Sequence, residues 1–249
     1  MLTDGSDDEG FIDIQPWPVQ ELVGRLVCLT SLGRRGAIEA EATGDLFEAE
    51  TDRFDLQAWA ELELGPWLST TEARILRTPV SGLSDDDLAA CADALSASCA
   101  IGWAVRVLPD TTLRVALDNA DELRVLEWSP GPWRKVREIT RQVRLRSDQE
   151  LADEREKWDI VVWRLSLFQD ANDDAVDQAA LVDVLAEVTE LGKLRTDGTD
   201  LVTDDGAPFS AFAEEELAKL EHHAALRLRA LNWVCGLGQD WDSAPLILD

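Results

Sequence analysis

The sequence contains three short signals that start helices, and these constrain its fold more than any other feature. Ser69 is followed by Glu72, and Ser147 by Glu150, in the spacing of a capping box. Ser84 precedes three aspartates, which are favoured in the first turn of a helix. After Ser84 and after Ser147, apolar residues recur every three or four positions, as they do on the buried face of a helix. The chain is therefore predicted to be built from helices.

The other segments show helical periodicity or helix boundaries, with short breaks between them. We expect helices over about residues 19–42, 52–64, 70–77, 85–107, 119–127, 134–146, 148–168, 177–191 and 211–234. Residues 112–117 alternate as a short strand would, and residues 195–209 contain two Asp-Gly turns and form a loop or a small hairpin. The prediction is an all-α fold with at most a minor short strand pair. It consists of a mobile acidic leader over residues 1–16 and a single helical domain over residues 17–249.

The chain carries 50 acidic and 23 basic residues, a formal net charge of −27. Such a field repels nucleic-acid phosphates and anionic membranes, so neither is an expected partner. No apolar stretch approaches the roughly eighteen residues of a membrane-spanning helix, and the first residues are acidic, unlike a secretory signal. A cytoplasmic protein is expected. Its acid excess either keeps the surface solvated in a salty or crowded cell or recognises a basic partner.

Ten tryptophans and no tyrosine are spread along the chain. This spread favours core packing over a ligand-stacking cluster. The four cysteines have no CxxC spacing and only two histidines are present, so neither a structural zinc site nor a disulfide is expected. We interpret the cysteines as small buried residues in a reducing cytoplasm. Walker, Rossmann and GxSxG patterns are absent, and the sequence predicts no cofactor.

Six cations stand close together near the middle of the chain, with Glu138 as the one acidic residue among them. They are Arg134, Lys135, Arg137, Arg141, Arg144 and Arg146. If this segment is a helix, Arg134, Arg137, Arg141 and Arg144 fall on one stripe. In so acidic a chain we expect the stripe to pair with the protein's own carboxylates. The alternative is a docking site for an anionic ligand or an acidic partner.

The C-terminal part of the sequence combines pairing groups with indoles. Its candidate residues are Arg229, Asn232, Trp233, Trp241 and Asp242. An Arg–Asp pair with a tryptophan wedge would lock the tail onto the last helix, and we expect such a structural clasp. A ligand site made of the same residues is the alternative.

One group of carboxylates and a histidine is the nearest approach to an acid–base or metal cluster. Glu215, Glu216 and His222 lie on the predicted last helix, with His223 next to them. There is no HExxH and no pair of ExxH segments, and adjacent histidines on a helix point about 100° apart. A solvated surface is expected here, no metal is predicted, and an unrecognised catalytic site is the alternative.

The segment from Arg229 to Asp242, Arg-Ala-Leu-Asn-Trp-Val-Cys-Gly-Leu-Gly-Gln-Asp-Trp-Asp, resembles the closing signature of the bacterial family known as domain of unknown function 4272. Further segments are similar to that family in the same order, namely Arg25–Leu29 with Arg35–Glu39, Leu83–Leu88, Ile101–Pro109 and Leu145–Glu150. The resemblance runs from about residue 20 to residue 242. It implies a mainly helical fold and gives no activity, because none is established for the family.

Two functions from different classes follow from these observations. The first is a binding or regulatory protein, immunity-like, whose acidic surface engages a basic partner. The second is an enzyme with a carboxylate and histidine site at Glu215, Glu216 and His222. The sequence favours binding over catalysis, because it contains no recognisable catalytic motif.

We predict that the protein becomes more stable as salt is added. Fifty acidic side chains on one domain repel one another, and the Debye length of about 8 Å at physiological salt shortens further as salt rises. Screening should relieve this repulsion more than it weakens local ion pairs. Thermal melting from low salt to about 1 M KCl measures the effect, and a melting temperature that stays flat or falls contradicts the prediction.

Overall fold

The computed structural model describes residues 14–42, 44–110, 113, 120–170, 178–192 and 194–246. This part of the chain contains nine α-helices and no β-strand, which confirms the all-α prediction. Two isolated antiparallel bridges, Thr196–Leu201 and Val202–Pro208, fold residues 195–209 into a small hairpin-like loop. Except for Leu113, the strand suggested for residues 112–117 lies outside the described residues, as does the leader before Ile14.

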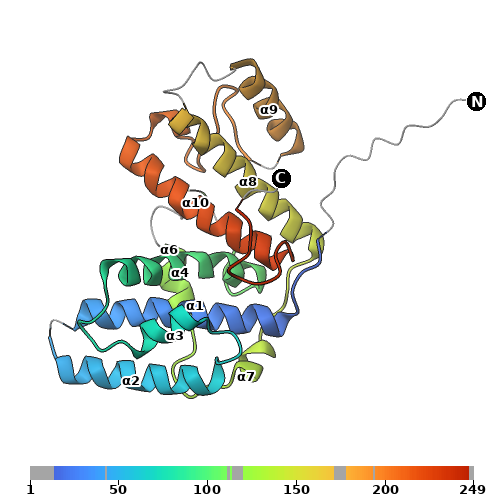
Figure 1. Cartoon of the computed structure of the whole chain (residues 1–249). Coiled ribbons are helices and arrows are strands. Elements are labelled where there is room, and N and C mark those ends of the chain that lie inside the picture. The colour runs from blue at the N-terminus through green and yellow to red at the C-terminus, as the bar shows by residue number, and fades with distance from the viewer. Residues whose placement is uncertain are drawn as a thin grey trace, which may run out of the picture.

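The helices form two groups in the cartoon (Figure 1). The first group contains α1 (Val19–Glu41), α2 (Leu46–Glu63), α3 (Thr70–Arg77), α4 (Asp85–Ala104), α6 (Ala120–Trp128) and α7 (Val136–Thr140). The second contains α8 (Asp148–Asp170), α9 (Gln178–Leu191) and α10 (Glu214–Val234). Helix α10 packs against both α4 and α8 and so joins the groups. No helix within the described ranges is long and apolar enough to cross a membrane.

The capping interactions that were predicted at three helix starts are present as hydrogen bonds in the structure. Ser69 Oγ accepts from the Glu72 N–H at 3.2 Å, and Glu72 Oε2 accepts from the Ser69 N–H at 2.8 Å. The same reciprocal bonds join Ser84 with Asp87 and Ser147 with Glu150. These boxes satisfy N–H groups that have no partner inside their own helix.

Helix α2 begins at Leu46, earlier than predicted. The carboxylate of Asp45 accepts the N–H groups of Phe47 at 2.9 Å and Glu48 at 3.1 Å, which makes Asp45 the N-cap. The predicted start at residue 52 followed the apolar pattern, which is weak in the first turns of this helix because those turns are exposed.

Helix α1 is the centre of the first group. Every residue from 22 to 33 is buried, because α2, α3, α4, α6 and α7 all pack around this helix. The interior therefore includes Arg25, whose guanidinium pairs with Glu72 of α3. It also includes Arg35, which pairs with Glu39 at 2.7 Å and donates to the carbonyl oxygen of Thr78.

Burial of arginines extends through the whole described chain, and every buried arginine has a carboxylate partner. Apart from Arg25, whose partner is Glu72, each partner lies within 3.2 Å. These other pairs are Arg35–Glu39, Arg53–Glu50, Arg146–Asp110, Arg155–Asp159, Arg164–Asp200 and Arg227–Asp121. Pairing is required, because a buried charge without a partner is costly.

The prediction of one helix over residues 134–146 is wrong. Helix α7 covers only Val136–Thr140, and the chain beyond it is irregular. The cause lies at Arg146, whose backbone N–H donates to the Ala104 carbonyl at the end of α4 and whose side chain donates to the Trp103 carbonyl, both at 2.9 Å. The segment leaves the helical path because it crosses and caps the end of α4.

The tryptophans and cysteines fill the interior largely as expected. All four cysteines are buried and free, and burial raises the pKa of the Cys28 thiol to about 12. Nine of the ten tryptophans are buried or partly buried, with Trp59 and Trp158 almost fully enclosed. The exception is Trp133, which is 63% exposed.

Substitution of Gly24 by alanine tests the close approach of α1 to Trp67. A Cβ at this position would lie 2.3 Å from two indole carbons, and the indole is held by the hydrogen bond from Trp67 Nε1 to Glu21 at 2.8 Å. Alanine favours a helix by about 1 kcal/mol over glycine, but overpacking costs about 1–3 kcal/mol. We expect Gly24→Ala to lower the free energy of unfolding measured in urea.

Gly36→Ala is the matched control on the same helix, because its Cβ would lie 3.1 Å from the Cys91 Cβ, a much milder contact. Its loss of stability should be clearly smaller. A Gly24→Ala variant that is as stable as the wild type contradicts the packing argument.

Candidate functional site

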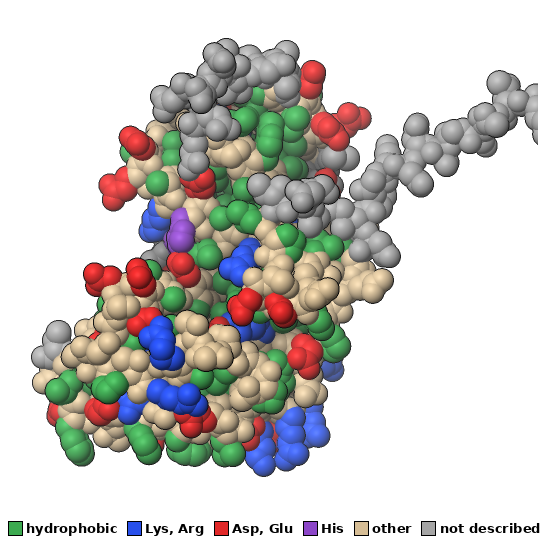
Figure 2. All heavy atoms as spheres, viewed as in Figure 1, with side chains coloured by type: hydrophobic (Ala, Val, Ile, Leu, Met, Phe, Trp, Pro, Cys, Tyr) green, Lys and Arg blue, Asp and Glu red, His purple; other side chains and the backbone are tan. Residues whose placement is uncertain are grey.

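The predicted arginine stripe is a solvent-exposed cationic patch. We define the cationic patch as Arg134, Lys135, Arg137, Arg141 and Arg144, all of which are exposed on or beside α7. Figure 2 shows basic side chains gathered at this corner of the molecule. No carboxylate of the described residues lies within 4.0 Å of any of these cations, so the internal pairing that we expected is not observed. The four arginines do not form one helical stripe, because the helix ends at Thr140 and Arg141 and Arg144 lie beyond it.

The C-terminal clasp is present, with a different pairing from the one expected. Arg229 Nη2 donates to the carbonyl oxygens of Trp241 at 3.3 Å and Asp242 at 3.1 Å, and not to the Asp242 carboxylate. Asn232 Nδ2 donates to the carbonyl oxygen of Pro245 at 2.9 Å. The Trp241 ring meets the Trp233 ring edge to face at 5.4 Å. These contacts hold the tail on α10.

A cavity of about 550 Å³ adjoins the clasp, with Arg229, Trp241 and Asp242 in its wall. Its opposite wall comes from α3 and α4. The carboxylate of Glu72 in that wall is already engaged by Arg25. The hypothesis that the clasp residues bind a ligand is therefore compatible with a hollow next to them. However, most charged groups that line this hollow already bind other parts of the protein.

The carboxylates and histidine of the catalytic alternative do not converge. Glu216 accepts the Ala213 N–H at 3.1 Å and so caps α10. Glu215 and His222 lie two turns apart, about 10 Å along the helix. His222 Nε2 is 2.7 Å from the carboxylate of Asp93, and both side chains are partly exposed. Among the residues that the structure describes, no three His, Cys, Asp or Glu side chains are arranged to hold a metal ion.

His223, which the sequence did not single out, is the more enclosed of the two histidines. Its Nδ1 lies 2.5 Å from Ser96 Oγ and 3.7 Å from a carboxylate oxygen of Glu122. Burial, followed by the nearby positive charge of Arg227, lowers the pKa of His223 to about 4. The imidazole is therefore neutral at neutral pH.

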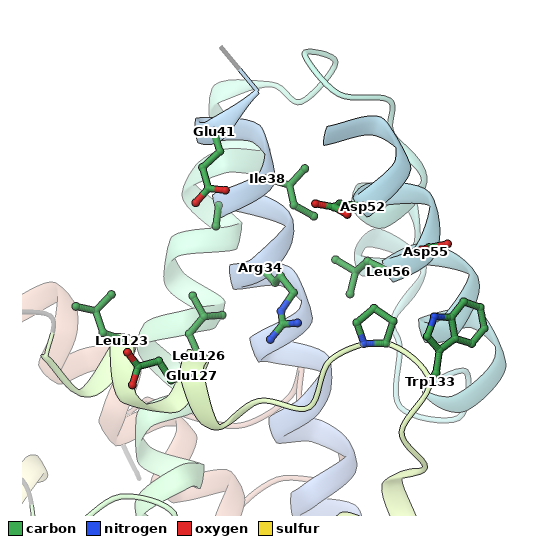
Figure 3. Close-up of a pocket in the computed structure, with 12 residues that line it drawn as sticks. Arg34, Ile38, Glu41, Asp52, Asp55, Leu56, Leu123, Leu126, Glu127 and Trp133 are labelled. Carbon is green, nitrogen blue, oxygen red and sulfur yellow. The ribbon is translucent and has the colours of Figure 1, made fainter. Parts of the chain in front are cut away.

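A further hollow of the described structure was not predicted from the sequence. This cavity of about 630 Å³ lies between α1, α2, α6 and the segment that follows α6 (Figure 3). Its apolar wall includes Ile38, Leu56, Leu126, Pro132 and Trp133. Its charged residues are Arg34, Glu41, Asp52, Asp55 and Glu127.

A smaller hollow of about 200 Å³ continues the same cleft between α1 and α2. It shares Ile38, Glu41 and Asp52 with the larger cavity and adds the carboxylates of Asp45 and Glu48. We call the two hollows together the acidic groove. One end of the groove is surrounded by carboxylates, and Arg34 stands toward the other end (Figure 3).

The outer side of α2 carries exposed apolar side chains. Phe47, Phe54 and Leu62 are 83%, 58% and 74% exposed, and helical spacing places them on one stripe, which we call the α2 outer face. Asp52 and Asp55 lie on the same helix and line the groove, so the stripe and the groove are neighbours. Figure 2 shows hydrophobic side chains alternating with acidic ones along this edge.

The pH dependence of stability tests the environment of His223. Between about pH 6.5 and the folded pKa of about 4, the unfolded chain binds a proton at this residue that the folded protein does not. The free energy of unfolding should therefore fall as pH is lowered through this window, and His223→Gln should reduce that slope. Urea unfolding at about pH 7 and about pH 5 measures the difference.

His222→Gln is the control, since that side chain is more exposed. Its slope should lie closer to that of the wild type than that of His223→Gln does, because His222 is only a secondary cause of the lowered His223 pKa. Equal slopes for the wild type and His223→Gln contradict the assignment.

Comparison of the chain with protein-family models, with curated proteins and with solved structures gives no match. The resemblance to domain of unknown function 4272 therefore stays a prediction from the sequence segments that carry it.

Proposed function

We propose that this protein is a regulatory or immunity-like binding module that engages a basic protein partner through the α2 outer face and the acidic groove. One observation carries the proposal: Phe47, Phe54 and Leu62 are exposed on a helix whose surface also bears carboxylates. Exposed apolar groups gathered at a polar rim are characteristic of interaction sites. The proposal assigns the acid excess a role in recognition in addition to solvation.

The two kinds of side chain would contribute differently to binding. Carboxylates attract a basic surface over a distance and raise the association rate. Aromatic and aliphatic side chains contribute most of the affinity once they are covered. The side-chain carboxylates of Glu41, Asp52 and Glu127 accept no hydrogen bond and form no ion pair with any described residue, so their charges remain available to a partner.

The enzyme alternative has less support in the described structure. Glu216 is engaged in a helix cap, and His222 pairs with Asp93. None of Glu215, Glu216 and His222 lines any of the three hollows described above. A catalytic proposal would need these groups to face one substrate position.

Binding of a synthetic amphipathic peptide tests the proposal. The probe is a helical peptide of about 18 residues made of leucine and lysine, and titration calorimetry at low salt measures its dissociation constant. We expect binding that weakens with salt and weakens about tenfold or more in the double variant Phe47→Ser and Phe54→Ser. Val182→Ser on α9, which also alters an exposed apolar residue, should bind like the wild type.

Two further peptides separate specific docking from simple charge attraction. One replaces leucine by serine and keeps the lysines, and the other replaces lysine by glutamate. Both should bind much more weakly than the probe. Equal binding of the lysine–serine peptide, or unchanged binding in the phenylalanine variants, overturns the proposal.

A further inference from the structure

We propose that the acidic groove holds the C-terminal end of a partner polypeptide, with the terminal α-carboxylate on Arg34 and a basic side chain among the carboxylates at the other end. The inference rests on the proposed function, because it specifies which part of the partner enters the groove. Its occupant is zwitterionic: an anion at one end and a cation at the other, joined by an apolar stretch.

Arg34 is a half-buried arginine without a carboxylate partner among the described residues. Its guanidinium is half-buried in the wall of the groove, where burial lowers its pKa. It donates one hydrogen bond, to the Ser129 carbonyl oxygen at 3.2 Å, and no carboxylate of the described residues lies within 4.0 Å. Each fully buried arginine of the described chain, in contrast, has a carboxylate partner. A guanidinium has five N–H donors, so Arg34 can still bind a carboxylate from outside.

The opposite end of the groove suits a cation. Glu41, Glu48 and Asp52 surround the smaller hollow, and their carboxylates accept no hydrogen bond from the described residues. Asp45 is different, since its carboxylate caps α2. An ammonium or guanidinium group placed here would meet several carboxylates and no competing cation.

The spacing of the two ends matches a short extended peptide. Arg34 and Glu41 are seven residues apart on α1, which is about 10 Å along the helix. Three residues of extended chain span about 10 Å. A terminal carboxylate on Arg34 therefore places the side chain of the residue three positions upstream near Glu41 and Asp52.

The walls favour a chain end with apolar side chains. Ile38, Leu56 and Trp133 provide contacts along the groove, and its volume of about 630 Å³ is within the range of sites that hold short ligands. The segment after α6 passes below Arg34 on its way to Trp133 (Figure 3), and Arg34 donates a hydrogen bond to its Ser129 carbonyl oxygen. A continuing chain would meet that segment, whereas a chain that ends at Arg34 fits. An anion alone would be repelled by the acidic end, and a cation alone would leave the Arg34 guanidinium without a carboxylate partner.

Two hexapeptides that differ only at the C-terminus test the proposal. The probes are acetyl-Ala-Ala-Lys-Ala-Leu-Leu with a free carboxylate and the same peptide with a C-terminal amide, titrated into the full chain at low salt. We expect the free acid to bind about tenfold tighter or more, because the amide removes the charge-assisted bonds to Arg34. Arg34→Gln should bind both peptides with the affinity of the amide.

Arg137→Gln in the cationic patch is the matched control, because it removes an exposed arginine outside the groove. It should keep the preference for the free acid. Thermal melting establishes that both variants fold. A second variant, Glu41→Gln with Asp52→Asn, should weaken the lysine hexapeptide and abolish its advantage over a hexapeptide with glutamine in place of lysine.

The inference is overturned if the wild type binds acid and amide equally, or if Arg34→Gln keeps the preference. The leucine–lysine helical peptide separates this outcome from failure of the proposed function. If that peptide binds in a manner that depends on Phe47 and Phe54 while the hexapeptides show no C-terminal preference, the groove inference fails and the binding function stands. If neither kind of peptide binds, both fail.

Discussion

Each arginine that the described structure buries has an acidic partner within hydrogen-bonding distance, and the arrangement of the helices depends on this constraint. A guanidinium removed from water without a counter-charge costs several kcal/mol, about as much as a domain's whole margin of stability. The ion pairs therefore fix how elements that are distant in sequence pack against one another. Those that join separate elements include Arg25–Glu72 between α1 and α3, Arg227–Asp121 between α10 and α6, and Arg164–Asp200 between α8 and the loop before α10.

The burial of arginines in the interior affects the charge that remains on the surface. The chain has only 23 basic residues, and among the described residues seven arginines are buried and paired with carboxylates. The unpaired charge outside is therefore predominantly negative, except at the cationic patch around α7. The α2 outer face and the acidic groove lie in this negative environment, and we propose that they use it to attract a basic partner. The same surplus of negative charge is the reason to expect stabilisation by salt.

Local signals in the sequence predicted the fold well, and contacts between distant segments account for what they missed. Ser69, Ser84 and Ser147 start helices in the structure because a cap needs only a side chain and the next turn. Residues 134–146 have helical periodicity, yet the helix ends early because Arg146 is needed at the end of α4. The candidate site was missed for the same reason: its walls come from α1, α2, α6 and a loop, and no single segment carries a recognisable motif.

Arg34 and Arg35 show this limit at two adjacent positions. Neighbours on a helix point about 100° apart, so the two identical residues leave α1 in different directions. Arg35 meets Glu39 and the carbonyl of Thr78, so its charge has a partner inside the protein. Arg34 turns toward the groove, where the elements that face it bring apolar walls and no carboxylate within 4.0 Å among the described residues. Periodicity alone can assign these residues to two faces of one helix. Only the packing of α2 and of the segment after α6 decides that Arg35 is enclosed by the protein itself, whereas Arg34 lines the groove that we propose a peptide end occupies.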